Sequence, residues 1–336
     1  MIRRTLAVVL ALAATAVLAA CGEKSEPTAA APKPQRLSLM LDYFPNADHA
    51  GIYDAKADGE FRRAGLDVTI RVPQDPALPL KLLATGKVDV AISYEPELLL
   101  ARDKGSDLVS IGALIQRPLT SIISIDSGLK TPADLENKTI GTAGIPYQSD
   151  YLKTIIEHAG GDPANVKEVN VGFNLVQAMR SKRVFATLGG YWNYEGIQLQ
   201  RQHKNPKIIR VDDAGVPTYN ELVIVVRRET ARNRGVALRR LMQALSRGHQ
   251  TLRKDPASGV AALTKADPEL DRGLQREAVK QTLPVFFPAD KTKPFGWQSP
   301  TAWRTYARWM LRNDLVKQLP NVNRAMTNEY LPGQGL

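Results

Sequence analysis

Cysteine is almost absent from this chain of 336 residues, which contains only Cys21. A single cysteine excludes an intramolecular disulfide, a zinc site built on cysteines and an iron–sulfur cluster. Histidine is also scarce, and the four histidines never stand at the spacing of metal ligands. Three of them, His158, His203 and His249, lie in polar stretches, where we expect them to face solvent. We therefore expect neither a metal nor a cofactor.

The common signatures of catalysis are missing too. The sequence has no G-x-S-x-G, no G-x-x-x-x-G-K-[ST], no H-E-x-x-H and no G-x-G-x-x-G motif. Its formal net charge of +11 would permit a nucleic-acid partner. The N-terminal segment argues against that partner, because it is typical of exported proteins.

That segment combines a short basic start with an apolar run. Arg3 and Arg4 precede residues 6–20, which are almost entirely Leu, Ala and Val. The run is too short to span a membrane comfortably but suits a signal peptide. It ends in Leu-Ala-Ala-Cys21, which resembles the bacterial lipobox, where the cysteine is lipidated. The alternative is a plain signal peptide that happens to contain a cysteine.

The sequence therefore predicts a signal peptide over residues 1–20 and a lipidated tether over 21–35. The tether is rich in Pro, Ala, Lys and Glu and has no apolar period. Cleavage removes two arginines and no acid, which lowers the formal net charge to +9. We expect a lipoprotein on the extracytoplasmic side of the cell membrane, either periplasmic or outer-surface.

From residue 36 onward, short apolar runs alternate with helical stretches. This rhythm predicts an α/β fold with mostly parallel sheets. It restarts near residue 121, and the chain becomes almost wholly helical after residues 221–226. We therefore expect two lobes, one made of residues 36–120 plus 216–336 and the other of residues 121–215. A cleft between them would lie at the carboxyl ends of the strands.

Polar and aromatic residues gather just after the predicted strands, where such a cleft would lie. Aromatic residues make up only 6% of the chain, so these groups stand out. Some of the residues also have a purely structural interpretation, as helix caps, turn residues or core packing. The candidate ligand-binding residues are Tyr43, Asn46, His49, Ser93, Tyr94, Asn174, Trp192, Glu195, Tyr219 and Glu221.

The strongest group is Gly-Gly-Tyr-Trp-Asn-Tyr-Glu-Gly at residues 189–196. Trp192 after a Gly-Gly turn is badly placed for a core and well placed to stack on a flat heteroaromatic ligand. Glu195 can accept hydrogen bonds from an amino-substituted ring edge. Tyr219 and Glu221 lie where the chain returns to the first lobe, so they could form both hinge and pocket wall.

Six motifs together resemble the periplasmic binding proteins that serve uptake of thiamine pyrimidine precursors. Their superfamily includes aliphatic-sulfonate-binding proteins and a eukaryotic thiamine-pyrimidine synthase. The motifs are LDYFPNADHAGIY (41–53), GKVDVAISYEPE (86–97), GFNLVQAM (172–179), GGYWNYEG (189–196), YNELV (219–223) and TNEYLP (327–332). The resemblance implies a type II periplasmic-binding-protein fold that closes on a free or formylated aminomethylpyrimidine. It also implies delivery to an ABC permease.

By position, the resemblance implies that Trp192 stacks on the pyrimidine and Glu195 reads its amino edge. Asn46, His49, Tyr43 and Asn174 would contribute from around the cleft. The family usually has Trp where this chain has Tyr43, which leaves room for a different or larger ligand such as riboflavin. In the synthase, the histidine of the first motif is a substrate and a cysteine-rich iron site lies near YNELV. Residues 221–228 contain no cysteine, so we expect a binding protein and not an enzyme.

A third alternative is an interaction lipoprotein without a small ligand. The basic stretch over residues 227–254, which holds nine Lys or Arg and one acid, suggests this alternative. Such a stretch is usually a solvated helix face, although it can also meet anionic lipid or a permease. In every alternative we expect a monomer.

Overall fold

The computed structural model describes residues 34–333. The predicted signal peptide, the lipidation site Cys21 and most of the predicted tether lie outside the described residues. Gln35, the last residue of that predicted tether, is already the first residue of strand β1. In the described part of the chain, no helix has the length and apolar character needed to cross a membrane.

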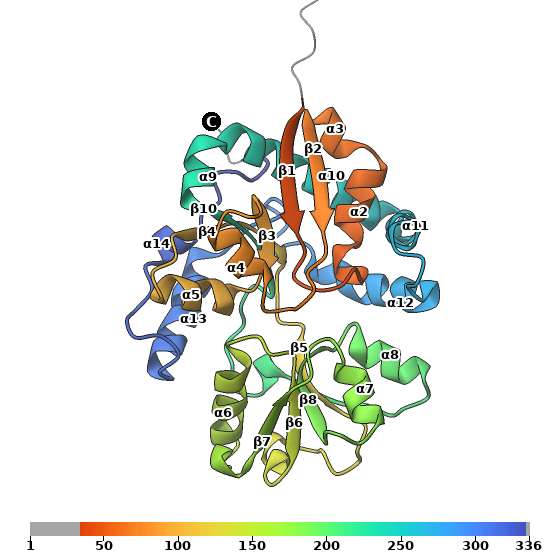
Figure 1. Cartoon of the computed structure of the whole chain (residues 1–336), viewed down its shortest axis with the longest axis vertical. Coiled ribbons are helices and arrows are strands. Elements are labelled where there is room, and N and C mark those ends of the chain that lie inside the picture. Colours follow the sequence, from red (N-terminus) through yellow and green to blue (C-terminus); the bar gives the residue numbers. More distant parts are fainter. Residues whose placement is uncertain (1–33, 334–336) are drawn as a thin grey trace, which may run out of the picture. The chain divides into compact units, whose positions relative to one another are not determined.

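The described chain folds around two five-stranded sheets, one in each of two lobes (Figure 1). In lobe 1 the strand order is β2-β1-β3-β10-β4, and β10 alone runs antiparallel to its neighbours. All side chains of β3 and β4 are buried, as are those of β10 except its last residue. The strands are β1 (Gln35–Met40), β2 (Leu66–Arg71), β3 (Val90–Ser93), β4 (Leu108–Ile115) and β10 (Leu222–Arg227).

Lobe 2 repeats this arrangement with the order β7-β6-β8-β5-β9, where β5 is the antiparallel strand. The expectation of mostly parallel sheets is confirmed, and each sheet also contains one reversed strand. The reversed strands are those that enter a lobe directly from the other lobe, by a short link instead of a helical crossover. The strands are β5 (Thr120–Ser124), β6 (Thr139–Thr142), β7 (Lys167–Asn170), β8 (Ala186–Tyr191) and β9 (Lys207–Arg210).

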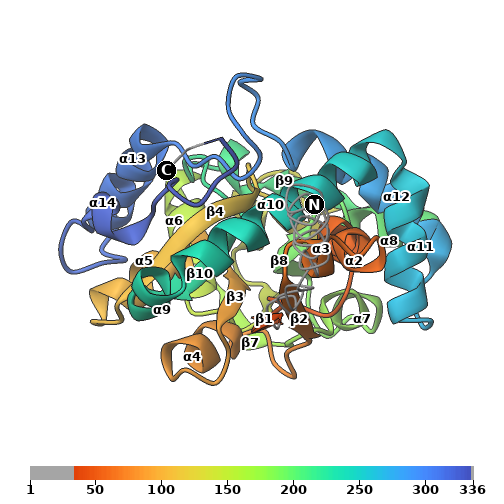
Figure 2. The same cartoon turned by 90° about the horizontal axis from the view of Figure 1, so that it is seen from above.

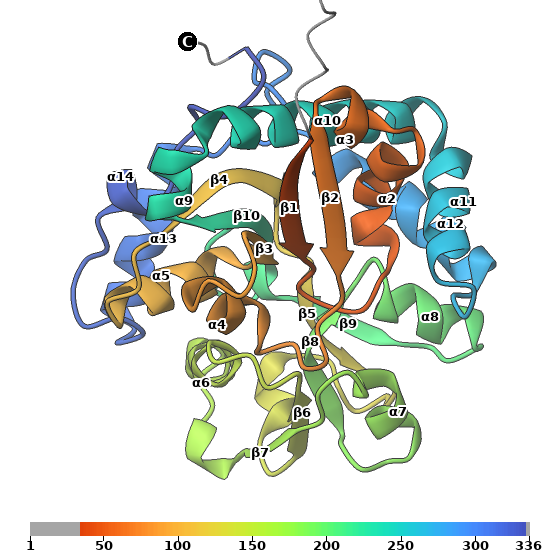
Figure 3. The same cartoon turned by 45° about the horizontal axis from the view of Figure 1, so that its top comes forward.

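Helices cover both sheets, as Figure 3 shows. Lobe 2 carries α6 (Gln148–His158), α7 (Leu175–Arg180) and α8 (Glu195–Arg201). Figure 2 shows the long helix α10 between α11 and α12 on one side and α13 and α14 on the other. Lobe 1 carries α2 (Ala50–Ala57), α3 (Glu60–Arg63), α4 (Pro79–Ala84), α5 (Glu95–Asp103), α9 (Arg228–Asn233), α10 (Gly235–Lys254), α11 (Pro256–Ala266), α12 (Arg272–Thr282), α13 (Pro300–Arg312) and α14 (Val322–Ala325).

Helix α10 anchors the helical layer to lobe 1. Its predicted apolar face is confirmed, since Leu238, Leu241, Leu245 and Leu252 are fully buried. It crosses α2 at a position where only glycine fits, because a Cβ on Gly248 would lie 2.5 Å from the Cβ of Ala55. This close crossing fixes α2, and therefore the loop before it, against the body of the lobe.

His249 on α10 corrects one expectation. Its ring is fully buried, and it packs 4.4 Å from the ring of Phe295. Nδ1 donates a hydrogen bond to the carbonyl of Leu245 over 2.7 Å. Burial lowers the pKa of His249 to about 4, so the ring is neutral at pH 7. The side chain lies in the core because it faces α2, whereas His158 and His203 are exposed as expected.

The basic stretch over residues 227–254 is partly neutralised by neighbouring acids. Arg228 pairs with Asp107 at 3.0 Å, and Arg234 pairs with Asp89 at 2.9 Å. Arg247 also pairs with a carboxylate, that of Glu60. These half-exposed pairs are typical of a solvated helix face, where such bridges contribute little to stability.

Candidate functional site

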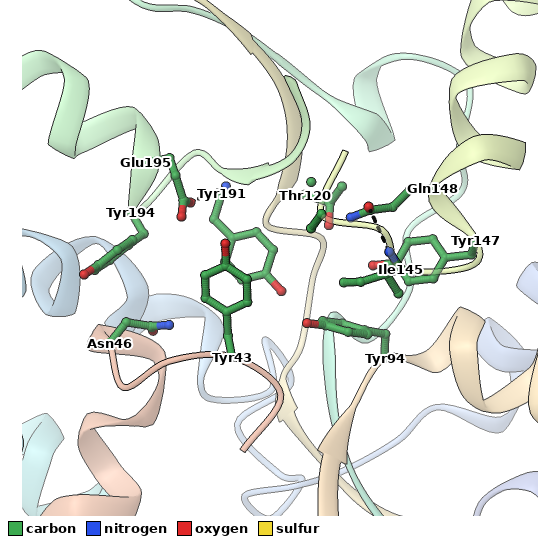
Figure 4. A pocket seen from close by; sticks show the side chains of 12 residues that line it. Tyr43, Asn46, Tyr94, Thr120, Ile145, Tyr147, Gln148, Tyr191, Tyr194 and Glu195 are labelled. Atoms are coloured by element: carbon green, nitrogen blue, oxygen red, sulfur yellow. Dashed lines mark hydrogen bonds between the residues drawn. The ribbon is translucent and has the colours of Figure 1, made fainter. Parts of the chain in front are cut away.

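A small cavity lies between the lobes, as shown in Figure 4. Most of its lining residues lie at the carboxyl ends of β1 and β3 in lobe 1 and of β6 and β8 in lobe 2, as expected for an α/β cleft, and Thr120 is the first residue of β5. The free volume is about 10 Å³, which is room for about one water. The lining residues are Tyr43, Asn46, Tyr94, Thr120, Ala143, Ile145, Tyr147, Gln148, Gly189, Tyr191, Tyr194 and Glu195.

The lining is aromatic and carries charge of only one sign. Five of its side chains are tyrosines, and Glu195 is the single charged one among the described residues that line the cavity. Among residues 34–333, no Lys, Arg or His belongs to the lining. A negatively charged ligand would therefore lose its water here and gain no countercharge. The site favours a flat ligand that is neutral or cationic.

Glu195 is the first residue of α8 and is buried. Its Oε2 accepts a hydrogen bond from the backbone N–H of Tyr191 over 2.7 Å, which holds the carboxyl group toward the cavity (Figure 4). Burial raises the pKa of Glu195 to about 7. A ligand that donates hydrogen bonds to this carboxylate would favour the ionised form.

Asn46 and Tyr94 are held in the cavity wall by a buried pair, Asp42 and His49. His49 Nε2 donates to Asp42 Oδ1 over 2.9 Å, and Tyr94 Oη donates to Asp42 Oδ2 over 2.9 Å. His49 Nδ1 accepts from the backbone N–H of Asn46 over 3.3 Å, and the Asn46 side chain caps the turn at Asp48. His49 was predicted to contribute to the ligand site. It positions lining residues instead, because both ring nitrogens already have partners in the wall.

Gln148 faces β8 across the cavity. Its Oε1 accepts from the backbone N–H of Ile145 over 3.3 Å (Figure 4), and its Nε2 lies next to Gly189. Gly189 has φ +109°, and a Cβ at this position would lie 2.3 Å from Gln148 Nε2. Only glycine permits both this backbone conformation and this approach. The amide of Gln148 thus supplies a hydrogen-bond donor close to the cavity.

Trp192 does not line the cavity, which corrects the expectation that its indole faces the cleft. Its Nε1 donates to the carbonyl of Pro118 over 3.2 Å, and the guanidinium of Arg210 lies 4.2 Å from the ring centre. The indole therefore covers the link between the lobes. The neighbouring Tyr191 and Tyr194 lie in the cavity wall instead.

The lining also lacks four more of the candidates, namely Asn174, Ser93, Tyr219 and Glu221. Asn174 is exposed, and its neighbour Phe173 packs 4.5 Å from the ring of Tyr43. Ser93 is buried behind the wall, where its hydroxyl donates to Glu97 over 2.5 Å. Neither Asn174 nor Ser93 lines the cavity in this structure, and their contacts to a ligand stay predictions.

Tyr219 and Glu221 were predicted to form both hinge and pocket wall. In the structure both residues lie at the hinge. The carboxylate of Glu221 accepts hydrogen bonds from the N–H groups of Leu119 and Thr120, over 2.6 and 2.8 Å. Tyr219 Oη donates to Glu221 over 3.2 Å. These contacts join the two chain segments that cross between the lobes. Neither residue lines the cavity in this structure, and their second predicted role, as pocket wall, stays a prediction.

Several lining residues were not candidates in the sequence: Thr120, Ala143, Ile145, Tyr147, Gln148, Gly189, Tyr191 and Tyr194. Gly189, Tyr191 and Tyr194 belong to the 189–196 motif. The position of this motif just after a predicted strand could have identified them as lining residues. Tyr147 and Gln148 follow β6, the strand paired in parallel with β8. The rule that ligands meet the ends of central strands could have found them.

Burial raises the pKa of five acids around the cavity and the hinge. The raised values are about 6 for Asp48, about 7 for Glu97, Glu195 and Glu221, and about 8 for Glu95. The folded protein thus keeps protons that the unfolded chain releases at about pH 4 to 4.5. The stability from these groups is present below that range and is lost as the pH rises through about 7.

We therefore expect the melting temperature of the ligand-free protein to be higher at pH 5 than at pH 8. His249 works in the opposite direction, because its lowered pKa adds stability as the pH rises from about 4 to about 6.5. One histidine does not outweigh five acids. Differential scanning fluorimetry from pH 5 to pH 8 measures the trend. A melting temperature that rises over this interval would contradict the burial of the acids.

The two lobes, their mixed sheets and the two crossing segments define the type II fold of periplasmic binding proteins. The fold aligns with the alkanesulfonate-binding protein SsuA of Xanthomonas axonopodis pv. citri bound to MOPS. The TM-score is 0.69 and the identity 19%, over 88% of this chain and 99% of that chain. At this identity the likeness concerns the fold alone.

The model of the NMT1/THI5-like family matches residues 46–258, and the chain belongs to this family. It is 31% identical over 287 residues to a formylaminopyrimidine-binding protein of Halalkalibacterium halodurans, covering 84% of this chain and 87% of that protein. A pyrimidine phosphate synthase of Legionella pneumophila is 24% identical, over 88% and 92% of the two chains. The riboflavin-binding protein RibY of Chloroflexus aurantiacus is 26% identical, over 90% and 88%. The relatives of this chain thus include proteins named as binding proteins and a protein named as a synthase.

Proposed function

We propose that this protein is the substrate-binding component of an ABC importer for a thiamine pyrimidine precursor. Its ligand would be a formylated aminomethylpyrimidine or a related aminopyrimidine. The observation that carries the proposal is Glu195, the single charge in the tyrosine-rich lining formed by the described residues. The 31% identical relative that binds formylaminopyrimidine supports the same ligand class.

An aminopyrimidine matches the polar groups of the cavity. Its exocyclic amine donates hydrogen bonds, and Glu195 is placed to accept them. Its ring nitrogens accept hydrogen bonds, and the amide of Gln148 supplies a donor. The hydroxyl of Tyr43 is buried without a hydrogen-bond partner among the described residues, so it too can meet a polar ligand atom. Tyrosine rings provide flat apolar surface for the pyrimidine faces.

Binding requires movement, because a pyrimidine is much larger than the 10 Å³ of free volume. The lobes are joined by only two segments, between β4 and β5 and between β9 and β10. A hinge at these segments can open the cleft for ligand entry. In this structure the lobes are in direct contact beside the cavity, where Asn193 of lobe 2 donates to Asp48 of lobe 1 over 2.7 Å.

A binding role fits the site better than the synthase activity named for one relative. The product of that synthase is a phosphate ester, whereas this cavity has no cationic side chain in its described lining. His49 lies behind the wall, engaged with Asp42 and Asn46. Residues 221–228 contain no cysteine. We therefore infer that the chain binds its ligand without transforming it.

Riboflavin is the second candidate ligand. Tyrosine rings suit the flat isoalloxazine system, and a riboflavin-binding relative is 26% identical. The small cavity favours the pyrimidine, since a three-ring ligand needs a larger rearrangement. Protein purified with bound riboflavin would be yellow, and flavin absorbance would distinguish the two ligands directly.

Export, anchoring and partners complete the proposal. The apolar run over residues 6–20 and Cys21 support an exported lipoprotein, held at the cell membrane on its extracytoplasmic side. A monomer that hands its ligand to an ABC permease fits this location. The alternative of an interaction lipoprotein is less well supported, because arginines of the 227–254 stretch already pair with acids of the same lobe.

The pH dependence of binding tests the proposal. The ligand amine needs the ionised carboxylate, but the pKa of Glu195 in the ligand-free protein is about 7. Affinity for formylated aminomethylpyrimidine, measured by titration calorimetry, should therefore rise between pH 6 and pH 8.5. In Glu195→Gln the same titration should give a weaker and flatter profile. Wild-type affinity that falls over this interval would contradict the assigned role of Glu195.

A further inference from the structure

A buried hydrogen-bonded contact joins the two lobes beside the cavity but outside its lining. Asn193 lies in the turn between β8 and α8 of lobe 2. Its Nδ2 donates to Asp48 Oδ1 of lobe 1 over 2.7 Å and to Thr282 Oγ1, at the end of α12, over 2.6 Å. All three side chains have 0% exposure, so the contact is closed to water.

We propose that Asn193 is a positioning residue that latches the lobes together and sets ligand affinity without touching the ligand. The inference rests on the proposed function, because it concerns closure around the bound molecule. Asn193 stands in the same turn as the lining residues Tyr194 and Glu195. Fixing this turn against lobe 1 therefore fixes the two ligand-facing side chains at the same time.

Helix α12 is the surface of lobe 1 that receives this turn. Gln275 on α12 donates from Nε2 to the hydroxyl of Tyr194 over 2.9 Å. Further along α8, Arg201 lies 3.6 Å from Asp271 at the start of α12. Asn193 is the buried centre of this interface, and Arg201 lies at its exposed rim. The contacts thus connect one element of lobe 1 with one turn and helix of lobe 2.

The latch leaves part of its hydrogen-bonding capacity unused. Asp48 Oδ2 and Asn193 Oδ1 are buried without a hydrogen-bond partner among the described residues. In an open cleft both atoms would be hydrated, so closure costs their solvation while it gains the bonds from Asn193 Nδ2. The two effects oppose each other. An equilibrium balanced in this way is readily shifted by the additional contacts of a ligand.

Small-angle X-ray scattering of the full chain, without ligand, tests the latch independently of the ligand's identity. Asn193→Ala should increase the radius of gyration, because the open arrangement becomes more populated. Thr282→Val, which keeps the side-chain shape and removes only the hydroxyl, should act in the same direction. Asn205→Ala, at an exposed position of lobe 2, is the matched control and should leave the scattering unchanged. Unchanged scattering for both latch variants would overturn the proposal.

Calorimetry with formylated aminomethylpyrimidine then measures the consequence for binding. Asn193→Ala should weaken affinity about 10-fold, while Thr282→Ser should retain affinity close to wild type. The double variant Asn193→Ala with Thr282→Val should lose little more than Asn193→Ala alone, because the bond that Thr282→Val removes is already lost in Asn193→Ala. Additive losses would overturn the latch. Failure of the wild type to bind would count against the proposed function, while the scattering result would still decide the latch.

Discussion

Replacing Glu195 by alanine is expected to weaken binding of formylated aminomethylpyrimidine about 10- to 100-fold. The substitution removes the single charged hydrogen-bond acceptor in the described lining of the cavity. It also frees the backbone N–H of Tyr191, which Glu195 holds at 2.7 Å. Titration calorimetry at pH 8, where the carboxyl group is ionised, measures the loss.

The matched control for this substitution is Glu157→Ala. Glu157 also lies on a helix of lobe 2, but its side chain is 49% exposed and does not belong to the cavity lining. Affinity should be unaffected by this change. Equal affinity of wild type and Glu195→Ala would remove Glu195 from the ligand site, whatever the identity of the ligand.

Phosphorylation of the ligand should weaken binding by about 100-fold or more. The phosphate ester of the same aminopyrimidine carries negative charge into a cavity whose described lining has no cation and contains Glu195. Burial removes the hydration of the phosphate, and no positive group replaces it. Calorimetry with the ester and with the unphosphorylated compound gives the ratio directly.

Glu195→Gln separates charge repulsion from simple lack of space in this comparison. The substitution removes the negative charge and keeps the size of the side chain. It should therefore narrow the affinity gap between the ester and the unphosphorylated ligand. A wild-type protein that binds the ester as tightly as the unphosphorylated ligand would contradict the assignment of a neutral ligand class.

Much of the fold could be predicted because it follows from local patterns. Apolar runs mark the strands, and glycines such as Gly65, with φ +69°, end the helices. The predicted helix over residues 50–64 is divided in the structure, because Gly59 with φ +75° separates α2 from α3. Strand β5 was not predicted. Its five residues become a recognisable strand only through pairing with β8 and β9, which are distant in sequence.

Four candidate side chains, Tyr43, Asn46, Tyr94 and Glu195, line the cavity. They could be found because they directly follow the ends of predicted strands or begin a helix there. The position of Trp192 could not be found in this way. The register between β5 and β8 shifts after Ser121, so that Gly190 pairs with Ser121 and Leu188 with Ile122.

Gly189 is the extra residue in this β-bulge. A bulge changes which of two neighbouring side chains faces a given side of the strand end. It accompanies the placement of Tyr191 in the cavity wall and of Trp192 over the link between the lobes. The choice between the two therefore depends on long-range pairing and not on the composition of the motif.

Native mass spectrometry of a ligand competition is the most direct test of the central claim. The full chain is mixed with equal amounts of formylated aminomethylpyrimidine, its phosphate ester, riboflavin and an alkanesulfonate. The mass of each complex then identifies the bound ligand. We expect one dominant complex, of one protein with one unphosphorylated aminopyrimidine. A dominant complex with the ester or the sulfonate, or no complex with any of the four, would contradict a cavity built around Glu195 for a neutral aminopyrimidine.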